Sequence, residues 1–223
     1  ADSIRYAFNH WPPYSMSDTS NYSGIDLDVA REIANRIGVE LQVRKCHFKR
    51  CLKEMEVGDL DMMSGIARND QREAYMAYAD TPYHSVSVIF HVRAGHEGLV
   101  QRYEDLKHLR VGMVTSSHYF EPFNSDHSLN KIAVPEEKQL PRMLEAGRID
   151  TYVGTNPNAA FDLMRMGLKG RIVPAVYNPD VEVPLHFALS RKSRQLKRLH
   201  MVSETIADIH RDGTMQKILD KYR

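Results

Sequence analysis

A seven-residue pattern that occurs twice limits the fold of this chain more than any other feature. Residues 55–61 read Met-Glu-Val-Gly-Asp-Leu-Asp, and residues 144–150 read Leu-Glu-Ala-Gly-Arg-Ile-Asp. Each copy ends a helical stretch at its glycine, which suits the left-handed conformation that closes a helix. Each copy then leads into a short strand-like stretch, 62–64 and 151–153. The same joint built twice predicts two similar α/β lobes, and a cleft between two lobes is a common place for a small molecule.

Strand and helix patterns alternate along the rest of the chain. Apolar strands are expected at 4–8, 40–44, 60–65, 85–92, 109–114, 171–176 and 184–189. Helices are expected at 25–37, 48–57, 136–146, 194–210 and up to Tyr222, and two more are expected to start after Thr115–Ser117 and at Asn156. This alternation favours mostly parallel sheets flanked by helices.

Length and charge exclude several classes of protein. The 223 residues allow one large domain or two lobes of about 100 residues each. With 30 Lys+Arg against 29 Asp+Glu, the formal charge is +1, which gives no broad surface for nucleic acid. No apolar run is long enough to span a membrane. The opening Ala1-Asp2-Ser3 fits a mature form whose signal peptide has been removed, and it fits a trimmed form equally well.

The two cysteines, Cys46 and Cys51, lie close together in the sequence. An oxidised pair would suit an exported protein and would join the end of the strand at 40–44 to the start of the helix at 48–57. Two reduced, partly buried thiols are the alternative, and spacing alone does not decide between them. His47 between the cysteines brings no fourth ligand, so we expect neither a metal site nor a cofactor.

Seven short motifs, in order, carry a resemblance to a known family. They are residues 24–30 (GIDLDVA), 58–61 (GDLD), Arg72, 78–83 (YADTPY), Leu106 with 110–112 (RVG), 147–150 (GRID) and 212–214 (DGT). Together they resemble the bacterial extracellular solute-binding proteins of family 3, the polar amino-acid type that serves ABC transporters, over essentially the whole chain. The resemblance implies an α/β, two-lobed type II periplasmic binding protein fold. Residues 1–92 with 186–223 would form lobe 1, residues 93–185 would form the inserted lobe 2, and the lobes would close on the ligand about a two-strand hinge.

Arg72 matches the family arginine that holds the ligand α-carboxylate, and a guanidinium offers two donors that fit a carboxylate. A surface arginine is the alternative reading. The stretch from Asp61 to Arg72 looks one residue shorter than the family norm, so Arg68 could share or take the role. The strand end that supplies backbone and hydroxyl contacts in the family corresponds here to Ser64, Gly65 and Ala67.

Trp11, the single tryptophan, falls where family members place an aromatic side chain against the ligand. An indole ring offers apolar area and attracts a ligand cation. A core tryptophan is the alternative, although the prolines that follow favour a loop. Phe48 matches a second wall position, and Tyr14 is a candidate for a third.

In the second lobe, Ser116, Ser117 and His118 lie at an expected strand-to-helix turn, where backbone N–H groups attract anions. Simple capping of the helix by serine is the alternative, and His118 more often lies in solvent. Further on, the family usually places an Asp or Glu for the ligand amino group, but this chain has Gly154, Thr155 and Asn156, with no carboxylate until Asp162.

A buried ammonium without a counter-charge would be costly. The missing acid therefore means that another acid serves or that the ligand lacks an ammonium group. Thr155 and Asn156 could instead bond a hydroxyl, carbonyl or amide.

The resemblance implies a monomer that binds a small carboxylate-bearing solute in the periplasm or outside the cell and delivers it to an ABC permease. A ligand-sensing domain of a receptor kinase is the second reading. A cyclohexadienyl dehydratase-like enzyme is the third, and it would need a general acid or base such as His118 or Glu121. No motif supports that chemistry, so we expect no enzyme.

Overall fold

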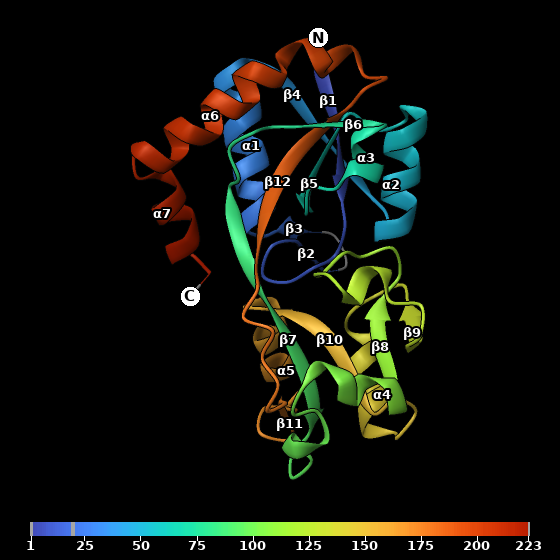
Figure 1. The fold of residues 1–223 in the computed structure, drawn as a ribbon. Helices are drawn as coiled ribbons and strands as arrows, with labels where there is room; N and C mark the ends of the chain where they lie inside the picture. Colours follow the sequence, from blue (N-terminus) through green and yellow to red (C-terminus); the bar gives the residue numbers. More distant parts are fainter. Residues whose placement is uncertain (1, 19–20, 223) are drawn as a thin grey trace. The chain divides into compact units, whose positions relative to one another are not determined.

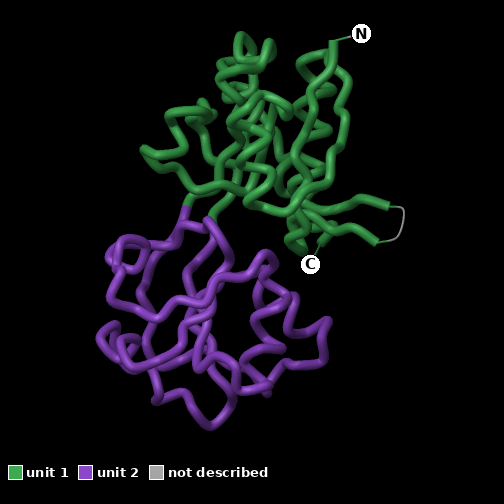
Figure 2. Tube along the Cα trace, turned by 90° about the vertical axis from the view of Figure 1, so that its right-hand side faces the viewer, with its two compact units in different colours: residues 1–85, 184–223 green, residues 86–183 purple. Residues whose placement is uncertain are grey.

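The computed structural model describes residues 2–18 and 21–222, which form two compact units (Figure 1). Unit 1 comprises residues 1–85 and 184–223, and unit 2 comprises residues 86–183 (Figure 2). Strands β7 (His84–Arg93) and β12 (Glu182–Ser190) carry the chain from one unit to the other. Within the described residues, no helix combines the length and apolar character that crossing a membrane requires.

Unit 1 is built on a sheet with the order β4 (Glu40–Lys45), β1 (Ser3–Phe8), β5 (Met62–Ile66), β12. Strand β1 runs parallel to β4 and β5, whereas β12 runs antiparallel to β5 and to β6 (Met76–Tyr78). A small hairpin pairs β2 (Met16–Ser17) with β3 (Tyr22–Ser23). The helical segments are α1 (Ile25–Ile37), α2 (Phe48–Val57), α3 (Asp70–Glu73), η4 (Arg194–Arg198), α6 (Leu199–Arg211) and α7 (Thr214–Asp220).

Unit 2 is built on a sheet with the order β7, β10 (Thr151–Asn156), β8 (Arg110–Val114), β9 (Asn130–Val134). Strands β10, β8 and β9 are parallel neighbours, and β7 runs antiparallel to β10 and to β11 (Ile172–Pro174). The helical segments are η1 (Glu97–Leu99), η2 (Tyr103–His108), η3 (Phe123–Ser125), α4 (Gln139–Glu145) and α5 (Asn158–Arg165). One apolar cluster packs around Phe90 and Phe123, and another packs around Leu140 and Ile149.

The repeated sequence pattern builds the same joint in both units. Its glycine has positive φ in each copy, 89° after α2 and 70° after α4. Its last residue accepts hydrogen bonds from the backbone N–H and the guanidinium of an arginine in the neighbouring parallel strand. Asp61 accepts from Arg5 of β1, and Asp150 accepts from Arg110 of β8. In return, each aspartate donates its own N–H to the carbonyl of that arginine. The repeat therefore ties a helix end to a strand start twice.

One predicted helix is wrong. No helix follows Thr115–Ser117; residues 117–120 are irregular between two short turns, and η3 begins only at Phe123. Pro122 disfavours the helical conformation at the residue before it, and Ser116 has a φ of 64°. Side chains satisfy the backbone in place of helical bonds, because the Val114 N–H donates to the Tyr119 hydroxyl.

Two other helices differ from the expected limits. The helix expected at 136–146 begins only at Gln139, and the one expected at 194–210 divides into η4 and α6.

Candidate functional site

In unit 1, the candidate residues follow the carboxyl ends of three parallel strands. Trp11 follows β1, Phe48 follows β4, and residues 64–68 include the end of β5. Because β1 is parallel to both β4 and β5, these ends share one edge of the sheet. Open α/β sheets bind ligands at this edge.

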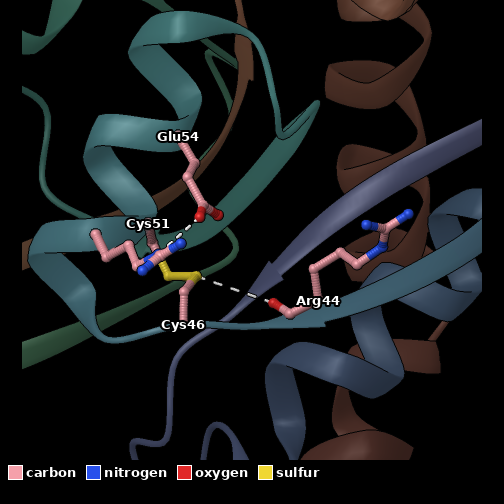
Figure 3. The surroundings of a disulfide bond; sticks show 5 residues. Arg44, Cys46, Cys51 and Glu54 are labelled. Carbon is pink, nitrogen blue, oxygen red and sulfur yellow. Dashed lines mark hydrogen bonds and ion pairs between the residues drawn. A yellow bond between two sulfur atoms is a disulfide. The ribbon is translucent and has the colours of Figure 1, made fainter.

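Phe48 begins α2 inside a short covalent loop. A disulfide joins Cys46, just before the helix, to Cys51, with the two Cα atoms 5.4 Å apart (Figure 3). The bridge that the sequence left open is therefore confirmed. It fixes the start of α2 to the end of β4. Phe48 is one of the residues of the closed loop, and it is buried.

Arg72 lies almost entirely inside unit 1, with 4% of its surface exposed. Its guanidinium carbon lies 5.3 Å from the centre of the Phe48 ring, and its Nη1 donates to the Ala67 carbonyl at 3.1 Å. The Tyr78 hydroxyl donates to the same carbonyl at 3.0 Å. Burial lowers the pKa of the Arg72 guanidinium, because leaving water disfavours the charged form. An anion brought to this position would offset that cost.

Arg68, the alternative anchor, has a different environment. Its side chain is about half exposed, and its nitrogens contact Glu73 at 2.5 Å and Asp80 at 3.4 Å. Both carboxylates belong to unit 1. Arg68 is thus already paired with acids at the surface.

Trp11 lies half-buried in a tight loop, where its backbone N–H donates to the Ser15 carbonyl at 2.7 Å. Its ring stacks on that of Tyr14 at 4.5 Å, and Tyr14 has no exposed surface. Gly65 has a φ of 68°, and a Cβ added there would lie 3.3 Å from the indole ring. The loop and the end of β5 therefore touch at a glycine, which leaves room for the Trp11 ring.

The half-buried Ser64 links the buried Tyr6 hydroxyl to a buried carboxylate. Its hydroxyl donates to Asp26 Oδ2 at 2.9 Å and contacts the Tyr6 hydroxyl at 2.5 Å. Because Ser64 gives its single hydrogen to Asp26, Tyr6 is the donor in the second bond. The Ser64 hydroxyl is thus an acceptor toward any further group.

Asp26 lies on α1 with 2% of its surface exposed, and its Oδ1 has no hydrogen-bond partner among the described residues. Burial raises the pKa of Asp26 to about 6, and the nearby Tyr83 and Ser64 hydroxyls oppose that rise. The Tyr83 hydroxyl stabilises the charge but lies outside hydrogen-bond geometry. Asp26 Oδ2 is 3.3 Å from the position of a Cβ added at Gly65. An acid therefore lies next to the end of β5.

In unit 2, the candidate residues also follow the carboxyl ends of parallel strands. Ser116, Ser117 and His118 follow β8, and Thr155 and Asn156 end β10. Ser116 is exposed, whereas Ser117 and His118 are half-buried. No helix begins here, so the expected helix start is wrong, and the anion-binding role of these three residues stays a prediction. Asn156 accepts the Ala160 N–H and so caps the first turn of α5.

Thr155 joins a line of three polar side chains. Its hydroxyl donates to Asn158 Oδ1 at 2.7 Å, and Asn158 Nδ2 donates to Glu137 Oε2 at 2.8 Å. Glu137 lies between β9 and α4, so it reaches the same edge of the sheet from a third parallel strand. A carboxylate is therefore present close to Thr155, although it comes from another part of the chain.

Sequence reasoning did not select Asp26, Glu137 or Asn158 as candidate site residues. Asp26 had a visible signal, because it is an acid within a stretch of buried residues at the start of α1. Glu137 had none, since residues 136–138 form an ordinary charged run. Asn158 was expected only as part of a helix.

Comparison with known proteins relates this chain to a protein family. The model of the bacterial extracellular solute-binding proteins, family 3, matches residues 4–223. The probable amino-acid-binding protein YxeM of Bacillus subtilis strain 168 is 23% identical over 216 residues, 94% of this chain and 79% of that protein. The L-cystine-binding protein TcyJ of Escherichia coli K12 is 24% identical over 215 residues, 95% of this chain and 79% of that protein.

A solved histidine kinase sensor domain, described as similar to periplasmic binding proteins, aligns with a TM-score of 0.87 at 19% identity. The alignment covers 99% of this chain and 95% of that one. The predicted type II periplasmic binding protein fold is thus confirmed. Because the family model matches the chain from residue 4 to its last residue, this protein belongs to the bacterial extracellular solute-binding proteins, family 3.

Proposed function

We propose that the protein binds a small carboxylate-bearing solute, an amino acid or a related organic acid, in the periplasm or outside the cell. It delivers this solute to an ABC permease, and it catalyses no reaction. The proposal rests on Arg72, a buried guanidinium that stacks on Phe48 at the carboxyl edge of three parallel strands. Two relatives, named for binding an amino acid and L-cystine, support the class of ligand.

Arg72 suits the carboxylate better than Arg68 does. A buried, desolvated guanidinium gains more from an incoming anion than an exposed one that already contacts two acids. Trp11 adds a half-buried aromatic face at the same edge of unit 1 and can cover the apolar part of the ligand.

Two matched variants test the anchor. A thermal-shift screen of L-amino acids and amine-free carboxylic acids first finds a ligand, because binding to the folded state raises the melting temperature. Calorimetry with that ligand should then show binding lost in Arg72→Ala and retained in Arg68→Ala. Unchanged affinity in Arg72→Ala, or loss in Arg68→Ala alone, would contradict the assignment.

A sensor domain is the second candidate, and the likeness to a histidine kinase sensor domain favours it at the level of fold. Ligand chemistry would be the same in both cases. The gene that encodes the chain decides between them, because a sensor requires a transmembrane segment and a signalling domain in the same polypeptide.

A further inference from the structure

The three-residue line in unit 2 has a fixed direction. A carboxylate can only accept hydrogen bonds, so Glu137 turns the Nδ2 of the Asn158 amide toward itself. The Oδ1 of Asn158 then points to Thr155 and takes the hydrogen of its hydroxyl. Thr155 has one such hydrogen, and its oxygen can therefore only accept from a third group. Glu137 thus determines what Thr155 can bind.

The local packing makes room for Glu137 at this position. A Cβ added at Gly154 would lie 2.9 Å from Glu137 Oε1, too close for any other residue without a shift. Asn158 is fully buried and Thr155 is 8% exposed, so these two members of the line are shielded from water, and Glu137 is partly buried. The glycine that precedes Thr155 therefore admits a carboxylate from the β9–α4 connection.

The Glu137 carboxylate affects the pKa values of two neighbouring tyrosines. Besides burial, it raises the pKa of the Tyr119 hydroxyl and of the Tyr152 hydroxyl. A negative carboxylate nearby disfavours a second negative charge on either tyrosine. A donor that also carries positive charge gains from this carboxylate, whereas a neutral hydroxyl donor gains only the hydrogen bond.

We propose that Glu137, through Asn158, positions the Thr155 hydroxyl to accept a hydrogen bond from the ligand's ammonium group. The inference rests on the proposed function and narrows it, because the bound solute is then an α-amino acid and not an amine-free acid. The acid that is missing at residues 154–156 is supplied from a distance, by Glu137. Asn158 and Glu137 act as positioning residues, and Thr155 makes the contact.

Wild-type protein gives the first test. Calorimetry would measure the binding of L-arginine, L-glutamine and L-cystine. Each amino acid would be compared with two analogues, one with hydrogen and one with hydroxyl in place of every α-amino group. The proposal expects the amino acid to bind at least about tenfold more tightly than either analogue, which is the size expected for a bond to a charged group. Equal or tighter binding of an analogue would overturn the proposal and leave the proposed function intact. If no compound binds, either in these sets or in the thermal-shift screen of L-amino acids and amine-free carboxylic acids, the proposed function fails and the inference fails with it.

Variants then test the relay, using the amino acid that binds wild-type protein. Glu137→Gln should weaken binding about tenfold, because a glutamine amide no longer fixes the direction of the Asn158 amide. Glu136→Gln is the matched control, with the same charge change one residue away, and should bind like wild type. Thr155→Val should weaken binding by a similar factor.

The double variant decides whether Glu137 acts through Thr155. If it does, Glu137→Gln adds little to the loss already caused by Thr155→Val. Losses that multiply would show that Glu137 acts on the ligand by itself and would overturn the relay. If Glu137→Gln does not fold, as judged by circular dichroism, Thr155→Val alone still decides the contact, and unchanged affinity there refutes it.

Discussion

Replacing Asp26 with asparagine should stabilise the protein at neutral pH, because the native structure buries a carboxylate that prefers to be protonated. The pKa of Asp26 rises from 3.8 to about 6 on folding. The folded protein therefore holds a proton more tightly than the unfolded chain between pH 4 and pH 6. Its contribution to stability is full below about pH 4 and is lost as the pH rises through about 6.

The size of the effect follows from that shift. A difference of roughly two pKa units corresponds to about 3 kcal/mol at neutral pH. An asparagine Oδ1 can accept from Ser64 as the carboxylate does, so the amide keeps that hydrogen bond. We expect Asp26→Asn to equal wild type near pH 4 and to gain up to about 3 kcal/mol in unfolding free energy by pH 7.

Urea unfolding of both proteins at pH 4, 5, 6 and 7, followed by circular dichroism, measures this gain. The quantity to read is the difference between variant and wild type at each pH, because other groups also titrate in this range. A difference that stays constant with pH would show that Asp26 does not titrate as its burial implies, and it would refute the reasoning.

Three further results are expected. Replacing both Cys46 and Cys51 with serine should lower the unfolding free energy by about 2 kcal/mol in urea titrations, because the bridge closes a short loop; an unchanged midpoint would contradict this. Trp11 emission should change when a ligand binds, and a constant spectrum beside a calorimetric signal would remove Trp11 from the site. Burial lowers the pKa of His91 to about 4, so the contribution of His91 to stability should fall as the pH drops from about 6.5 to 4. His91→Phe, which keeps the stack on Tyr152, should gain stability relative to wild type over this range, and a difference that does not change with pH would exclude this role of His91.

Much of the fold was predictable because local sequence specifies it. The stripe Ile25, Val29, Ile33 and Ile37 predicted α1, and each of these residues is buried. The repeat predicted two helix–glycine–strand joints, and both are present. The failure after Thr115 has a local cause too, since Pro122 disfavours the helical conformation at the residue before it, and side chains take over backbone bonds there.

The candidate site was only partly predictable. Arg72 and Trp11 follow from their places in motifs, but the pairing of Arg68 with Glu73 and Asp80 depends on how α3 and β6 lie together. Glu137 lies 18 residues before Thr155 in the sequence, and only the parallel pairing of β9, β8 and β10 brings the two to one edge. Strand order of this kind is not encoded in a local pattern.

The disulfide has a consequence for how the chain matures. Cys46 and Cys51 are the only cysteines among the 223 residues, so oxidation within this chain has one possible product and no mispaired isomers. A thiol oxidase is then enough to form the native bridge of this chain, and no isomerisation by a disulfide isomerase is required. Cells that lack an isomerase should therefore produce this chain with its native bridge, provided that an oxidase is present.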